Sequence, residues 1–309
     1  MSETVTAAAP HEKSLMRRIV EFPLVAMVIA VLLYAVANLV GLLIGKPLPL
    51  PEGDTRSIVQ SAINVVLVFA VYKLAMRRLG VKPRDDLPLD GAVKGVATGL
   101  VFGFILFSLL VVTAALLGVY RIVGPGGTQE LLRDAVLISI LPGFLEELFF
   151  RGILFRWIEE FAGTQVALAS TSLLFGFAHY FNPNATVFSS LAIAIEAGLL
   201  LGGAYVLTRN LWMVMGLHAA WNFTQGFIFD VPVSGLDQHG MVEAKLSGPE
   251  LLSGGAFGLE ASLIAFVIAS AAGIWLLVLA GRKGNLVPFW PSRQELARSH
   301  AELSAAEAG

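Results

Sequence analysis

Residues 22–45 read FPLVAMVIAVLLYAVANLVGLLIG, an apolar segment without a single charged residue. A helix of this length rises about 36 Å at 1.5 Å per residue. The apolar core of a bilayer is about 30 Å thick and needs about 20 apolar residues to cross it. The segment is also too long for the apolar core of a signal peptide. We therefore expect a retained membrane-spanning helix, and this decides the class of the chain.

The overall composition agrees with this class. Of the 309 residues, 56% are hydrophobic and only 14% are charged, whereas soluble domains carry roughly 25% charged residues. A net charge of -2 without a basic domain gives no indication of a nucleic-acid partner. The chain has no cysteine, which excludes disulfides, thiolate metal ligands and a cysteine nucleophile. The expected fold class is all-α, a polytopic transmembrane helical bundle in the lipid bilayer.

Further apolar segments predict about eight spans in total. We expect a polar N-terminal segment over residues 1–18, a membrane domain over 19–281 and a charged tail over 282–309. The predicted spans are Phe22–Gly45, Ser57–Met76, Gly95–Tyr120, Ala135–Trp157, Phe161–Phe181, Val187–Leu207, Leu211–Phe229 and Ala261–Ala280.

The distribution of basic residues predicts the orientation. With eight spans and a cytoplasmic N-terminus, 16 of the 21 lysines and arginines fall on the cytoplasmic side. Loops rich in lysine and arginine stay in the cytoplasm. We therefore expect a multi-pass protein of the cell membrane with both termini in the cytoplasm.

The fourth apolar segment is interrupted by charges, in Leu145-Glu146-Glu147-Leu148-Phe149-Phe150-Arg151-Gly152. A charge at the bilayer centre costs at least about 2.5–3.5 kcal/mol, so it is rare without a partner or a function. Glu147 and Arg151 are four residues apart and share a helix face, which predicts an ion pair. Glu146 is rotated by about 100° from Glu147. The simplest division makes Glu147 and Arg151 a structural clamp and leaves Glu146 for chemistry.

Two histidines also lie in apolar segments. His179 ends the predicted fifth span, and His218 shares a helix face with Asn222 four residues later. Glu146 lies deeper in its span than His179 does, so bringing the two together requires a tilted, kinked or re-entrant helix. Pro142 and Gly143 are candidates for such a kink. The remaining histidines fall in polar segments, where we expect them to be solvated: His11, His239 and His300.

A glutamate with two histidines is sufficient to activate a water molecule, either directly or through a metal ion. Asn222 and one histidine can donate hydrogen bonds to a developing oxyanion. The sequence contains neither the H-E-x-x-H motif of zincins nor a P-loop. The intramembrane polar residues therefore predict a hydrolytic site of another kind.

These residues resemble the CPBP family (CAAX protease and bacteriocin-processing, or Abi), which includes the type II CAAX prenyl proteases. That family is marked by E-E-x-x-x-R, F-x-x-x-H and H-x-x-x-N on separate spans. Here the three motifs are Glu146-Glu147-x-x-x-Arg151, Phe175-x-x-x-His179 and His218-x-x-x-Asn222. The resemblance covers roughly residues 135–225.

The resemblance implies an intramembrane endopeptidase that hydrolyses a peptide bond of a membrane-associated protein or peptide. Carried over by motif, Glu146 and His179 activate the water, and His218 and Asn222 stabilise the oxyanion. It also implies a structural role for Glu147 and Arg151. Members of this family are often labelled metalloproteases, and a metal-free glutamate mechanism has also been argued. Zinc is therefore one candidate cofactor, and the sequence does not decide between the two.

Two other functions fit the same residues. Glutamates and histidines inside spans also build the proton relays of transporters, although no internal repeat is apparent. A non-catalytic membrane scaffold of the same fold is the third alternative. Glu196, inside the sixth predicted span, either lines the cavity, pairs with a neighbour or positions the substrate.

Overall fold

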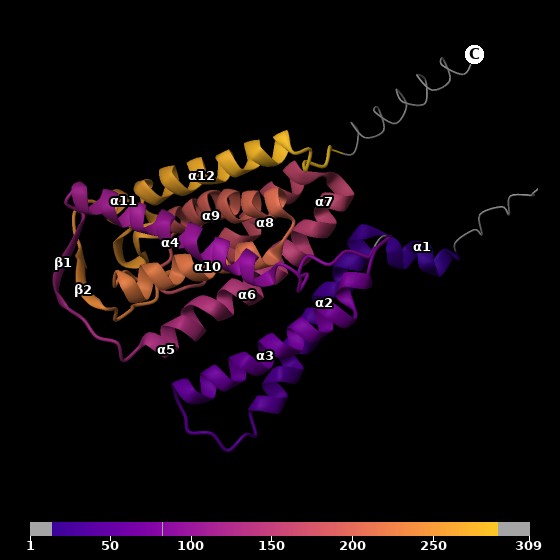
Figure 1. Ribbon diagram of the computed structural model, residues 1–309, viewed down its shortest axis with the longest axis horizontal. Coiled ribbons are helices and arrows are strands. Elements are labelled where there is room, and N and C mark those ends of the chain that lie inside the picture. The colour runs from indigo at the N-terminus through magenta and orange to yellow at the C-terminus, as the bar shows by residue number, and fades with distance from the viewer. Residues whose placement is uncertain (1–13, 82, 290–309) are drawn as a thin grey trace, which may run out of the picture.

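The computed structural model describes residues 14–81 and 83–289. The predicted N-terminal segment and charged tail lie largely outside these residues, as do His11 and His300. His239 is exposed, as expected. The described chain is mostly helical (Figure 1), which confirms the all-α class.

Five described helices are long and apolar enough to cross a membrane. One of them, α3, does so together with the short helix η1 (Met76–Arg78) that follows it. The five include the first apolar segment, whose residues 23–45 form one helix that begins at Pro23, a residue well suited to a first helical turn. The protein is therefore a multi-pass membrane protein, while the count of eight spans and the side of the termini stay predictions. The five helices are α2 (Pro23–Gly45), α3 (Asp54–Leu74), α4 (Ala92–Leu116), α9 (Val187–Thr208) and α12 (Leu263–Arg282).

The other three predicted spans are also helical, but they are short or irregular. Helix α8 (Thr164–His179) has 16 residues, and α10 (Leu211–Phe223) continues as a π-helical turn over Thr224–Ile228. The fourth segment alternates between α- and π-helix, and π-turns widen a helix locally and are frequent at functional sites. Its parts are α5 (Leu131–Arg133), η2 (Asp134–Ile140), α6 (Leu141–Glu147), η3 (Leu148–Phe155) and α7 (Arg156–Ala162).

Helix α10 is buried along nearly its whole length and packs mainly against α4. The two backbones approach closely because glycines face each other. A Cβ added at Gly99 would lie 2.1 Å from the Met213 carbonyl oxygen, and one at Gly216 would lie 2.5 Å from that of Val96. Small residues at membrane helix contacts allow this approach. Helix α9 packs against α8 and α12, and the α2–α3 hairpin lies to one side of the bundle (Figure 1).

A small antiparallel sheet lies at one end of the bundle and was not expected. Strand β1 (Tyr120–Pro125) pairs with β2 (Val242–Leu246). The predicted third span extended to Tyr120, but α4 ends at Leu116 and Gly118 then takes a positive φ of 73°. That boundary was therefore wrong, because hydropathy alone does not separate an apolar helix end from an apolar strand.

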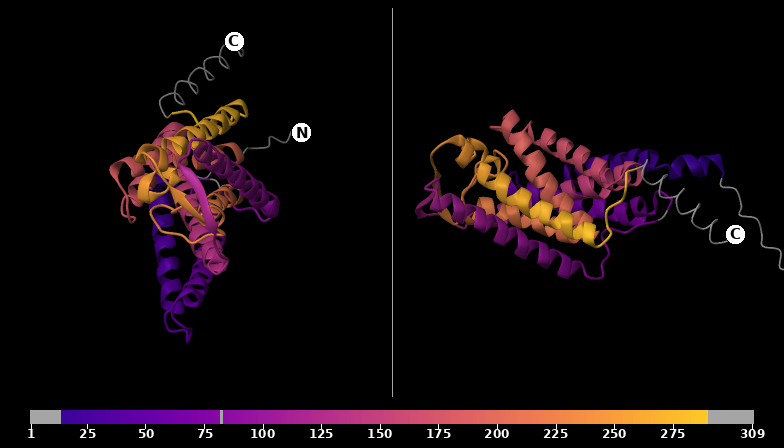
Figure 2. Two further views of the ribbon diagram at one scale, coloured as in Figure 1. Left: turned by 90° about the vertical axis from the view of Figure 1, so that its left-hand side faces the viewer. Right: turned by 90° about the horizontal axis from the view of Figure 1, so that it is seen from above.

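The described chain begins and ends at the opposite end of the bundle from this sheet (Figure 2). The amphipathic helix α1 (Leu15–Glu21) is capped by Ser14 and leads into α2. The remaining short elements are η1 (Met76–Arg78), α11 (Glu250–Ser253), η5 (Gly255–Phe257) and η6 (Leu259–Ala261).

Candidate active site

The four predicted catalytic side chains line one cavity of about 380 Å³. Glu146 comes from α6, His179 from the last residue of α8, and His218 and Asn222 from α10. The irregular fourth segment and the short α8 bring together residues that ideal straight spans would separate in depth. The loop after α10 also lines the cavity, through Val233, Ser234 and Leu236.

A hydrogen bond to the fourth segment holds Asn222. Its Nδ2 donates to the carbonyl of Ile138, in the π-helical stretch η2, at 2.9 Å. An asparagine amide carries two hydrogens, so one stays available to a ligand in the cavity.

Glu147 forms the predicted ion pair and a further contact. Its Oε1 accepts hydrogen bonds from Nη1 of Arg151 at 2.9 Å and from Nδ1 of His218 at 2.8 Å. Glu147 is 0% exposed and Arg151 is 1% exposed. The contact between Glu147 and His218 joins the first and third sequence motifs. It holds the His218 ring by Nδ1 and leaves Nε2 as the ring nitrogen that Glu147 does not bind. Spacing along the chain gave no signal for this contact.

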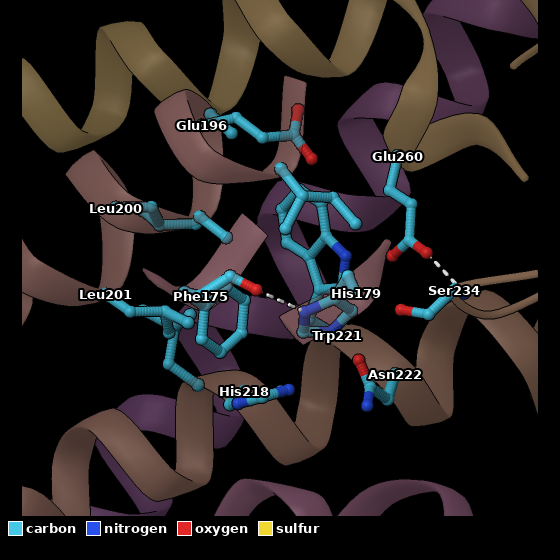
Figure 3. A pocket seen from close by; sticks show the side chains of 14 residues that line it. Phe175, His179, Glu196, Leu200, Leu201, His218, Trp221, Asn222, Ser234 and Glu260 are labelled. Carbon is cyan, nitrogen blue, oxygen red and sulfur yellow. Dashed lines mark hydrogen bonds between the residues drawn. The ribbon is translucent and has the colours of Figure 1, made fainter. Parts of the chain in front are cut away.

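Phe175, the first residue of the second motif, contacts both Arg151 and His179. The Arg151 guanidinium lies over its ring, 4.8 Å from the centroid, in a cation–π contact. The ring centroid of His179 is 4.5 Å away, and Nδ1 of His179 is 2.8 Å from the Phe175 carbonyl oxygen (Figure 3). Phe175 therefore positions His179 by both its ring and its backbone.

Glu146 differs from its neighbour in its contacts. It is only partly buried and lines the cavity, and its Oε2 has no hydrogen-bond partner among the described residues. Its surroundings include the Tyr34 side chain of α2, whose hydroxyl donates to the Leu145 carbonyl at 3.2 Å. Each of the two adjacent glutamates has an Oε2 without a hydrogen-bond partner among the described residues. They differ because two donors hold Oε1 of the fully buried Glu147, whereas Glu146 lines the cavity.

Glu146, His179 and His218 are the candidate zinc ligands of this cavity. Within residues 14–81 and 83–289, no group of three or more histidines, aspartates and glutamates is arranged to hold a metal ion. Structural and catalytic zinc sites need at least three protein ligands close together. The described arrangement therefore does not fit a metal ion.

A smaller pocket of about 30 Å³ adjoins the cavity and shares His179, His218, Asn222 and Ser234 with it. Figure 3 shows Glu196 of α9 and Glu260 of η6 directed into this pocket, on the side away from His218 and Asn222. Glu260 and Ser234 were not predicted, because they belong to a polar, glycine-rich segment that resembles an ordinary solvated loop.

The comparison with protein families supports the motif-based resemblance. The model of the family "Type II CAAX prenyl endopeptidase Rce1-like" matches residues 128–224. The match contains all three motifs and spans the chain from the residues just before α5 to the first residue after α10. A search of curated proteins and a search of solved structures found no match.

Proposed function

Because the chain belongs to the type II CAAX prenyl endopeptidase family through residues 128–224, we propose that its cavity hydrolyses a peptide bond of a membrane-associated protein or peptide with a water activated by Glu146. The chain is broadly a CAAX-type intramembrane protease. The observation that supports this mechanism is the meeting of Glu146, His179, His218 and Asn222 on one cavity.

The first step uses the free carboxylate. Glu146 takes a proton from a water molecule, and the water oxygen attacks the carbonyl carbon of the peptide bond. A desolvated carboxylate with no donor on one oxygen is suited to this work as a general base. His179 lines the same cavity with its Nδ1 held by the Phe175 carbonyl, so its Nε2 is the nitrogen that orients the water.

The second step needs donors for the negative oxygen. The free amide hydrogen of Asn222 is one donor. When the His218 ring carries both protons, its Nε2–H is the other, because Nδ1 is already bound to Glu147. Such fixed donors stabilise the tetrahedral intermediate. Glu146 then returns its proton to the leaving nitrogen as the C–N bond breaks, which balances the reaction.

Cleavage of a membrane-anchored reporter peptide by purified protein tests this proposal. We expect Glu146→Gln and His179→Ala each to lower kcat at least about 100-fold, the lower end of the range for lost acid–base catalysis. His239→Ala and Glu243→Gln are matched controls, since both side chains are exposed, and they should cleave normally. Wild-type rates in both site variants would refute the mechanism.

The same reporter tests the metal question. We propose a metal-free reaction, so activity should persist in a strong chelator and metal analysis should find no stoichiometric zinc. A lasting loss of cleavage that added zinc restores would contradict this part of the proposal.

A further inference from the structure

Glu196 and Glu260 are two buried carboxyl groups that the proposed mechanism does not use. Glu196 is 2% exposed and Glu260 is 4% exposed. They come from different elements, line the same small pocket and interact electrostatically with each other. A carboxylate in an apolar interior is costly unless it is paired or protonated, and two carboxylates in one site do not both ionise freely.

The contacts of the two groups are unequal. Oε1 of Glu260 accepts a hydrogen bond from the backbone N–H of Ser234, in the turn that also lines the catalytic cavity. Oε2 of Glu196 is buried and has no hydrogen-bond partner among the described residues. Burial raises the pKa of Glu260 to about 7, although Ser234 and His218 act against this rise. One carboxyl is therefore anchored, and the other is directed into the pocket without a partner.

The charged and titratable surroundings of the pair are few. On the elements packed against it, His179 of α8 and His218 of α10 line the pocket, and α12 contributes only Ala269. Glu147 and Arg151 are bound to each other, with Arg151 donating to the Ala197 carbonyl at 3.2 Å, next to Glu196. Glu146 lines the adjoining cavity. The Glu260 carboxyl interacts electrostatically with His218.

The size of the pocket suits water. A volume of about 30 Å³ exceeds the roughly 10–15 Å³ that one water molecule needs. The lining is largely apolar, but its two glutamates, its two histidines and Asn222 offer hydrogen-bond partners to such a water. Water held there would contact the carboxyl pair on one side and the histidines and Asn222 on the other. Such water would connect the carboxyl pair with the histidines.

We propose that Glu196 and Glu260 share one proton and pass it, through water in this pocket, to Nε2 of His218, which then donates to the oxyanion. This role rests on the proposed function of His218. The transfer leaves two carboxylates, whose mutual repulsion is offset by attraction to the doubly protonated imidazole. The reverse transfer restores the shared proton after the product leaves. No bond other than that to the proton changes, and the two glutamates act as positioning residues.

The protonation of the ring can be read without any substrate. Nuclear magnetic resonance of protein labelled with ¹⁵N-histidine reports which ring nitrogens carry hydrogen, and His218→Gln identifies the signal. In both Glu196→Gln and Glu260→Gln, we expect the equilibrium constant for adding the second proton to the His218 ring to fall about tenfold, equivalent to one pH unit. The doubly protonated fraction at neutral pH should fall accordingly. Glu243→Gln, an exposed carboxyl on β2, should leave it unchanged.

Kinetics of reporter cleavage provide the second readout. Both variants should lower kcat about tenfold at neutral pH with KM unchanged and regain activity as the pH falls, while Glu196→Asp retains the wild-type profile. If neither variant changes the ring protonation or the pH profile, the proposal is overturned. Failure of the wild-type protein to cleave any reporter would refute the proposed function. The ¹⁵N signal of the His218 ring would still test whether Glu196 and Glu260 control its protonation. If Glu196→Gln does not fold, Glu260→Gln breaks the same pair.

Discussion

Separating Glu147 from Arg151 should destabilise the protein far more than separating an exposed pair of the same spacing. Both side chains are essentially inaccessible to solvent, and their contact is 2.9 Å long. Removing one partner of a buried pair leaves an uncompensated charge and costs about 3–5 kcal/mol. We therefore expect this loss from Glu147→Gln and from Arg151→Met alone. The double variant should lose at least about 2 kcal/mol less than the sum, within the range found for contacting residues.

Unfolding in mixed detergent micelles measures the free energies of unfolding of the wild type, the two single variants and the double variant. The matched control is the pair Glu52 and Arg56, which has the same spacing and a 3.2 Å contact, but its glutamate side chain is 87% exposed. Its coupling energy should lie below about 1 kcal/mol. The reasoning fails if the buried pair couples by less than about 0.5 kcal/mol, or no more strongly than the exposed one.

Three further results are expected. Asn222→Ala should lower kcat for the reporter about 100- to 1,000-fold, the cost of losing one oxyanion donor, and a smaller loss in initial rates would remove Asn222 from that role. Gly216→Ala should cost about 1–3 kcal/mol of stability by overpacking, since its Cβ would lie 2.5 Å from the Val96 carbonyl oxygen; unchanged thermal unfolding would contradict this. Because burial raises the pKa of Glu260 from 4.5 to about 7, its carboxyl binds a proton more tightly in the folded state. Its contribution, on the order of 3 kcal/mol, is complete below about pH 4.5 and is lost as the pH rises through 7. Glu260→Gln should flatten that slope, and an unchanged pH dependence of unfolding would argue against a perturbed Glu260.

The apolar segments predicted the helices well because the bilayer imposes one dominant constraint on length and polarity. The helix predicted over Phe22–Gly45 begins only one residue later, at Pro23. What hydropathy could not predict is how a helix is wound. The π-turns on both sides of α6 and the strand that begins at Tyr120 depend on contacts with distant segments, and these have no periodic signature in the chain.

The candidate site was predictable where its residues follow helix spacing. The four-residue intervals between Glu147 and Arg151, and between His218 and Asn222, place each pair on one face, as the structure also has them. Glu260 had no such signal. It lies in a polar segment after the last predicted site residue, and its burial results from the fold of that segment over the site.

The contact between Glu147 and His218 changes how the first motif is understood. The sequence divides its glutamates into one for structure and one for chemistry, because spacing detects only the partner on the same helix. In the structure, a single oxygen of Glu147 holds both Arg151 and the ring of His218, which lies 71 residues away. A change at Arg151 must therefore also disturb the orientation of His218. If His218 acts as proposed, the buried ion pair belongs to the positioning of the site, and its loss should reduce cleavage even in molecules that remain folded.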